Sequence, residues 1–281
     1  MTETASGGTA AVTSTLTRND GTTFRQFSVD GDVRPEAPVV VLSPAMGMPA
    51  GYYLTVLDAL AAAGLHGVAY EQRGHEKGGQ PAGWRRNFGY AELVEDLVQV
   101  IAQARSAHPD SPVIVLGHSL GGQVSVAAIG EHPGLYDGLI LMASSTPHWR
   151  HWSRKILAAG VLFPTIANVL GHFPGDRLKF AGREARRMMT QWGTLARSGR
   201  LPLGEDGLGA VDVPVLAVSI EGDWLGVPSA VDALCAKLPA STALRVHVDE
   251  EGIDHFKWAR RPASVMGSIT DWVATQPAFS R

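Results

Sequence analysis

A serine between two glycines, in the sequence Gly-His-Ser-Leu-Gly at residues 117–121, places the strongest constraint on how this chain can fold. Residues 112–116 before it are a short apolar run rich in β-branched side chains, which favours a buried strand. Residues 122–129 after it show the pattern of a helix. A strand that turns sharply into a helix through Gly-x-Ser-x-Gly presents the serine hydroxyl above a sheet. This context predicts that Ser119 is a nucleophile, and a purely structural glycine-rich turn is the alternative.

The flanking glycines and the following helix each contribute to such a turn. A side chain at Gly117 or Gly121 would crowd the neighbouring strand and helix. The free N–H groups at the start of the helix point toward the serine hydroxyl. We therefore expect the backbone N–H of Leu120, the residue after the serine, to donate to an oxyanion.

Apolar strands and amphipathic helices alternate along most of the chain. Continuous apolar strands between such helices predict a mostly parallel sheet with helices on both faces, which is an α/β fold. The expected strands are residues 22–29, 38–42, 67–70, 112–116, 138–143, 213–220 and 244–248, and the expected helices are residues 52–63, 90–107, 122–129, 228–238 and 264–273.

Residues 147–206 interrupt this alternation and predict an inserted helical cap. The segment shows helical stretches and no convincing strand, and about sixty residues are too many for a plain connection between two core strands. We expect it to cover the carboxyl edge of the sheet as a lid. The core then comprises residues 21–146 and 207–281. Residues 1–20 are expected to be a flexible N-terminal tail, because their start lacks the basic residues and apolar core of a signal peptide.

A serine hydroxyl needs an imidazole to take its proton and a carboxylate to fix the imidazole tautomer. In this kind of topology the order along the chain is serine, acid, histidine. His247 lies inside the expected strand 244–248, so its side chain should point to a sheet face. His255 follows that strand on a polar loop, and we predict that it is the base.

Two carboxylates follow the expected strand 213–220 and could supply the acid. We favour Asp223, because Gly222 allows the chain to turn before it and Pro228 begins the next helix. Glu221 stays open as the alternative, since it lies nearer the strand.

The second oxyanion donor should come from the loop after residues 38–42. Pro44 has no N–H, so Ala45 or Met46 must donate, and we prefer Ala45.

Composition narrows the partners and the compartment. A net charge of −3 gives no reason to expect nucleic acid, and the longest apolar stretch, residues 156–170, is too short for a membrane span. The single cysteine, Cys235, cannot form an internal disulfide, which is consistent with a reducing compartment, so we predict a cytoplasmic protein. We expect no metal and no organic cofactor, because no His/Cys/Asp group has metal-ligand spacing. The oligomeric state stays open.

These motifs together resemble the α/β-hydrolase superfamily over nearly the whole chain from about residue 20. Residues 70–75, Tyr-Glu-Gln-Arg-Gly-His, are similar to its acidic-x-Arg-Gly-His loop, and residues 221–228 are similar to its acid loop with one residue more before the proline. Pro-Ala-Met-Gly at 44–47 and Asp-His-Phe at 254–256 resemble predicted hydrolases related to serine aminopeptidases and monoacylglycerol lipases. The resemblance implies an eight-stranded sheet with a helical cap insertion.

The expected activity is hydrolysis of a carboxylic ester, thioester or related acyl bond of a small molecule, through an acyl-enzyme on Ser119, His255 and Asp223. Acyl transfer, lactone or C–C bond hydrolysis, cofactor-free peroxidation, and a ligand-binding module with a vestigial triad stay open. An apolar slot under the cap should accept a medium-length acyl chain, unless the cap aromatics serve packing alone. The candidate substrate-binding residues are Met46, His118, Trp149, Trp152 and Trp224, with Phe163 and Phe173 as further lining.

Overall fold

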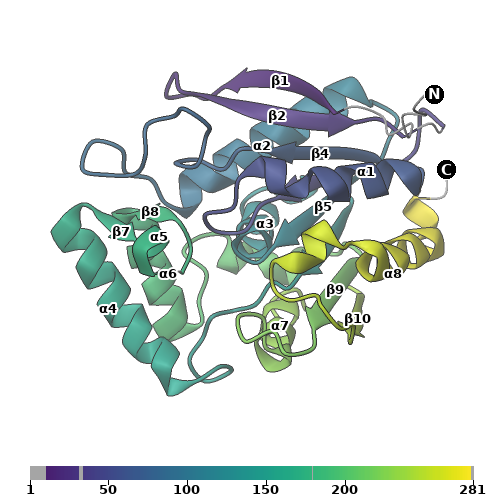
Figure 1. The fold of residues 1–281 in the computed structure, drawn as a ribbon. Helices are drawn as coiled ribbons and strands as arrows, with labels where there is room; N and C mark the ends of the chain where they lie inside the picture. The colour runs from purple at the N-terminus through teal and green to yellow at the C-terminus, as the bar shows by residue number, and fades with distance from the viewer. Residues whose placement is uncertain (1–10, 32–33, 179, 280–281) are drawn as a thin grey trace, which may run out of the picture.

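A single sheet of eight strands forms the centre of the computed structural model, which describes residues 11–31, 34–178 and 180–279 (Figure 1). Its strands are β1 (Val12–Thr17), β2 (Thr23–Val29), β3 (Val39–Ser43), β4 (His66–Tyr70), β5 (Val113–His118), β6 (Gly138–Met142), β9 (Val215–Ile220) and β10 (Ala243–Val248). They follow the order β1-β2-β4-β3-β5-β6-β9-β10. The β1–β2 and β2–β4 pairs are antiparallel and the other five are parallel. The predicted mostly parallel eight-stranded sheet is confirmed.

Helices cover both faces of this sheet, and each face has its own hydrophobic cluster. Along β3, Val39 and Val41 pack in the cluster with α2 and α3, whereas Val40 and Leu42 pack in the cluster with α1 and α8. The alternation follows from the two-residue period of a strand, in which successive side chains point to opposite faces. The helices that accompany the central sheet are α1 (Leu54–Ala62), α2 (Tyr90–Ala107), α3 (Leu120–Glu131), α7 (Pro228–Cys235) and α8 (Ala263–Thr275). Short 3-10 helices are η1 (Ala50–Tyr53), η2 (Glu205–Ala210), η3 (Lys257–Arg260) and η4 (Pro277–Phe279).

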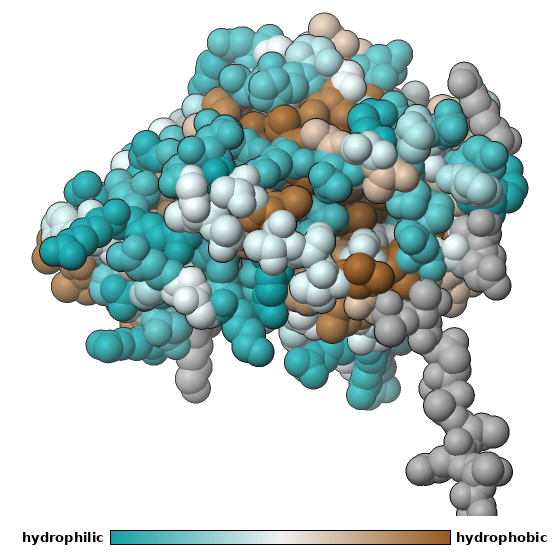
Figure 2. All heavy atoms as spheres, turned by 90° about the horizontal axis from the view of Figure 1, so that it is seen from above, coloured by the Kyte–Doolittle hydropathy of each residue, from teal (hydrophilic) through white to brown (hydrophobic). Residues whose placement is uncertain are grey.

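The edge strand β1 differs from the expectation of a flexible tail over residues 1–20. Residues 12–17 pair with β2 along their whole length, while residues 1–10 lie outside the described residues. The strand is rich in β-branched Thr and Val, which favour extended backbone, but its side chains are mostly exposed. It therefore carries no alternation of apolar and polar residues. The face of the molecule at the top of Figure 1 carries hydrophobic patches between hydrophilic side chains (Figure 2).

The chain between β6 and β9 folds mainly as helices, to the side of the central sheet (Figure 1). Its elements are α4 (Arg154–Leu170), β7 (His172–Pro174), α5 (Gly175–Leu178), β8 (Arg183–Ala185) and α6 (Arg186–Ser198). The antiparallel pair β7–β8 was not expected, because strands of three residues are too short to show a period. Helix α4 contains the apolar stretch 156–170, and no helix of the described residues is long and apolar enough to cross a membrane. The division into a core and a lid stays a prediction.

Candidate active site

Ser119 lies at the junction of β5 and α3 in a backbone conformation that is uncommon for a residue with a side chain. Its φ is 54° and its ψ is −115°. A Cβ at Gly117 would overlap the backbone of Gly122, and a Cβ at Gly121 would overlap the carbonyl of Ser43. The two glycines are thus required by close backbone approach, as the sequence predicts. Ser144, which sequence reasoning missed, stabilises the turn from the loop after β6 by donating to the Gly117 carbonyl at 2.8 Å.

The structure brings Ser119, His255 and Asp223 into hydrogen-bond contact, although they lie on three separate loops. His255 Nε2 is 2.9 Å from Ser119 Oγ, and His255 Nδ1 is 2.8 Å from Asp223 Oδ2. A carboxylate only accepts hydrogen bonds, so Nδ1 carries the proton that donates to Asp223. Nε2 is then left as an acceptor for the serine hydroxyl, which is the tautomer that a general base needs.

Asp223 is held in place by the loop that carries it. The loop follows β9, and the residue is 4% exposed. Its Oδ1 accepts the backbone N–H groups of Leu225 at 2.8 Å and of Gly226 at 3.0 Å. These bonds orient Oδ2 toward His255.

The rival carboxylate, Glu221, points elsewhere. Its Oε2 is 2.8 Å from His247 Nε2, and both side chains are largely exposed, 66% for Glu221 and 41% for His247. His247 stands on β10, as its position in the expected strand predicts. The two carboxylates therefore bond to different histidines, and only Asp223 contacts His255.

Of the two expected oxyanion donors, Leu120 lies where the prediction places it and Ala45 does not offer a free N–H. Leu120 is the first residue of α3, where backbone N–H groups have no acceptor within the helix. The Ala45 N–H donates to the hydroxyl of Tyr53 at 3.0 Å. Tyr53 lies at the end of η1, and no sequence pattern indicates this bond. Met46, the other candidate of the loop, lies at the pocket.

His118 supports the site from behind and does not line the pocket. It is fully buried, and this burial, followed by the charge of nearby His255, places its pKa well below the usual value. Its Nε2 is 2.8 Å from the backbone carbonyl of His255 and 3.2 Å from the indole nitrogen of Trp258. Its Nδ1 is 2.8 Å from the Tyr53 hydroxyl. Hydrogen bonds thus run from Ala45 through Tyr53 and His118 to the His255 loop.

A pocket opens above the serine, between loops at the end of the central sheet and the segment between β6 and β9, called the inserted segment below. Met46 and Trp224 line it from the loops after β3 and β9, and Trp152, Phe180 and Trp192 line it from the inserted segment. Predicted lining residues Met46, Trp152 and Trp224 therefore lie at the pocket.

The other predicted lining aromatics lie outside this pocket. Trp149 donates from its indole to the Arg197 carbonyl at 3.2 Å. Phe163 and Phe173 belong to an aromatic cluster, with ring centroids 4.7 Å apart. Because Phe180 and Trp192 join this cluster and also line the pocket, the cluster supports the pocket wall.

Known structures and families give the class of protein. A carboxyl esterase from Bacillus coagulans superposes with a TM-score of 0.73 at 16% identity, covering 94% of this chain and 98% of that one. An identity this low establishes the fold alone, and that fold is the α/β-hydrolase fold. The model of the family described as serine aminopeptidase, S33 matches residues 34–190. The chain belongs to this family.

Curated proteins are similar in sequence to part of this chain. The monoacylglycerol lipase of Mycolicibacterium smegmatis is 38% identical over 103 residues, which are 37% of this chain and 36% of that protein. The monoglyceride lipase of Rattus norvegicus is 29% identical over 135 residues, 47% of this chain and 43% of that protein. The matched part spans less than half the length of each of these two relatives.

Proposed function

We propose that this protein is a serine hydrolase that cleaves a carboxylic ester through an acyl-enzyme. The observation that carries the proposal is the contact of Ser119 with His255 and of His255 with Asp223 at a strained strand-to-helix turn. Family membership and the names of the relatives are consistent with it.

In this mechanism His255 Nε2 takes the proton of Ser119 Oγ as the hydroxyl oxygen attacks the substrate carbonyl. The Leu120 N–H stabilises the oxyanion of the tetrahedral intermediate, with a second donor from residues 45–46. If Ala45 is that donor, its N–H must first leave the Tyr53 hydroxyl. His255 then protonates the leaving alcohol, and the acyl group stays on Ser119. Water attacks the acyl-enzyme by the same route and releases the acid.

The substrate class follows from the pocket walls and the relatives' names. Met46, Trp152, Phe180 and Trp192 present apolar surface beside Ser119, which suits an acyl chain. Relatives are named as lipases of monoacylglycerols, so a glycerol monoester with an apolar acyl chain is the first substrate to test. The inserted segment would act as the lid over that chain.

A fluorophosphonate probe tests the nucleophile directly, because it forms a bond with an activated serine and needs no knowledge of the substrate. We expect stoichiometric labelling of the wild-type protein, with the adduct on the peptide that contains Ser119. The Ser119→Ala variant should not be labelled. A folded wild-type protein that stays unlabelled would contradict the proposal and favour a ligand-binding module.

The reaction type needs a substrate panel of monoacylglycerols, p-nitrophenyl esters, acyl thioesters and lactones. We expect the highest kcat/KM for esters with an apolar acyl chain. Labelling at Ser119 without hydrolysis of any ester would retain the nucleophile and reject ester hydrolysis as the function.

A further inference from the structure

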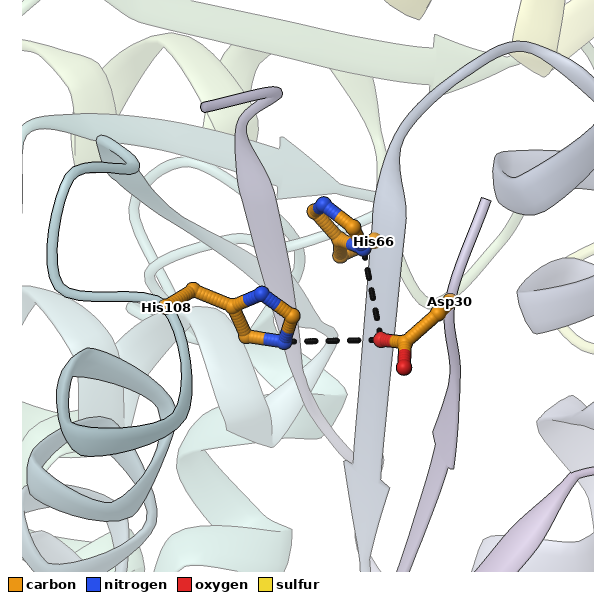
Figure 3. A group of neighbouring side chains, drawn as sticks. All are labelled: Asp30, His66 and His108. Atoms are coloured by element: carbon orange, nitrogen blue, oxygen red, sulfur yellow. Dashed lines mark ion pairs between the residues drawn. The ribbon is translucent and has the colours of Figure 1, made fainter. Parts of the chain in front are cut away.

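Two histidines and an aspartate from distant parts of the chain meet at the end of the sheet opposite the serine turn (Figure 3). Asp30 directly follows β2, His66 is the first residue of β4, and His108 caps the carboxyl end of α2. β2 runs antiparallel to β4, and Val29 pairs with Gly67, so the end of one strand lies beside the start of the other.

The donor atoms of the three side chains have the spacing of metal ligands. His66 Nδ1 is 3.3 Å and His108 Nε2 is 3.4 Å from the same oxygen, Asp30 Oδ1. One ligand atom from each residue lies within 4.8 Å of the others. Tetrahedral ligands at about 2.1 Å from a Zn²⁺ ion are about 3.4 Å apart, so the two separations between a histidine nitrogen and the Asp30 oxygen match this geometry.

His66 adds a second, independent indication of a ligand. The residue is 5% exposed, and neither of its ring nitrogens has a hydrogen-bond partner among the described residues. An unsatisfied buried polar group is costly, and a metal ion bound to Nδ1 would give this nitrogen a closer partner than the Asp30 oxygen at 3.3 Å. The side chain of Asp30 is 68% exposed, which leaves an entry path and room for a water ligand.

The two imidazole rings approach the carboxylate together. They are tilted by 32° with centroids 4.2 Å apart, and each turns one nitrogen to the same oxygen of Asp30. A divalent cation accepts lone pairs from two neutral imidazoles, while Asp30 offsets part of its charge.

We propose that Asp30, His66 and His108 bind a divalent transition metal of the Zn²⁺ type, which ties β2, β4 and α2 together. Imidazole and carboxylate ligands suit Zn²⁺, Co²⁺ and Ni²⁺. The metal site lies far from the proposed active site. His66 is level with Val113 in the sheet, because both pair with Val39 of β3. Ser119 lies six residues beyond Val113. Six residues of extended strand span about 20 Å. The metal therefore stabilises the fold and takes no part in the proposed hydrolysis.

Metal binding is measured on the full chain after removal of metal with a chelator. Zn²⁺ is titrated by calorimetry, and Co²⁺ is titrated by its visible absorption, which reports tetrahedral coordination. We expect one equivalent of Zn²⁺ to bind and to raise the Tm by several degrees, because the ligand binds the folded state. Asp30→Asn and His108→Ala should each weaken binding by at least about tenfold.

His132→Ala is the matched control for His108→Ala. His132 caps the carboxyl end of α3 with φ −130° and ψ 77°, and His108 caps α2 with φ −132° and ψ 73°. This control should bind Zn²⁺ as the wild type does. Wild-type protein that binds no equivalent of Zn²⁺, or Asp30→Asn and His108→Ala variants that bind as tightly as the control, would overturn the proposal. Asp30→Asn keeps the test valid if His108→Ala fails to fold, since Asp30 is exposed.

Discussion

Asp223 and Glu221 stand two residues apart after β9, yet each takes part in a different serine–histidine–carboxylate contact. Beside Ser119–His255–Asp223, the hydroxyl of Ser219 lies 2.9 Å from His247 Nδ1, while His247 Nε2 lies 2.8 Å from Glu221. These separations match the 2.9 and 2.8 Å of the first set. Distances between the three side chains therefore cannot distinguish a nucleophile from a serine that holds a sheet together.

The two sets differ in backbone and in access. Ser219 lies inside β9 and is fully buried, and the Arg245 guanidinium donates to its hydroxyl at 3.3 Å. Ser119 instead lies directly before the first turn of α3 and lines a pocket. Their carboxylates differ too: Asp223 is buried, whereas Glu221 and His247 are exposed to water, which screens their attraction. We propose that the strained turn, the adjacent pocket and the burial of Asp223 make Ser119 the reactive serine of the two.

Replacing each serine by alanine tests this comparison most strongly. Ser119→Ala should lower kcat by at least roughly 10³-fold, because the attacking atom is lost. Ser219→Ala should leave kcat near the wild-type value. Hydrolysis is measured on the best ester of the panel, with Tm as the control for folding. A Ser119→Ala rate within about tenfold of wild type at unchanged Tm would reject Ser119 as the nucleophile.

Replacing each carboxylate by its amide tests which histidine–carboxylate pair, His255–Asp223 or His247–Glu221, supports hydrolysis. Asp223→Asn should lower the rate by about 10²–10⁴, since the acid holds the base in its working tautomer. Glu221→Gln should change it little, because Glu221 and its partner His247 are exposed and neither lines the pocket. Steady-state kinetics on both variants decide the matter, and the reverse ranking would assign the acid to Glu221.

The glycine after the serine tests the backbone part of the comparison. Gly121→Ala should destabilise the fold by about 1–3 kcal/mol, because the new Cβ would overlap the Ser43 carbonyl. Gly267→Ala is the matched control within helix α8, where a Cβ meets nothing within 4 Å. That change should stabilise the fold slightly, since alanine favours helix. Equal effects on urea unfolding would show that the turn tolerates a side chain.

The smallest expected effect is the change in kcat/KM with the length of the acyl chain in the pocket. Each buried methylene is worth about 0.8 kcal/mol, so kcat/KM should rise several-fold per early extension of the acyl chain and then level off. Trp152→Ala should weaken this rise because Trp152 lines the pocket, and Trp149→Ala should retain it because Trp149 does not. An ester series from acetyl to decanoyl measures both. A steady fall after acetyl would leave the inserted aromatics with a packing role alone.

Local patterns were sufficient to predict much of this molecule. The apolar runs predict the buried strands, because a strand covered on both faces must be apolar throughout. The Gly-x-Ser-x-Gly turn predicts the position of Ser119, because close packing at Gly117 and Gly121 excludes side chains. His255 could be chosen because it follows the last strand. β1 was missed, since an exposed edge strand has no apolar period.

Other features depend on which distant residues meet, and only the tertiary structure decides that. Glu221 lies nearer the strand end than Asp223 in sequence, but the turn at Asp223 points its carboxylate at His255 and leaves Glu221 beside the exposed His247. The sequence shows that Ala45 has a backbone N–H, but only the tertiary structure shows that this N–H donates to the Tyr53 hydroxyl. The Asp30, His66 and His108 group has no spacing to recognise, because three separate elements bring it together. Local propensity acts over a few residues, whereas such contacts form only when the sheet assembles.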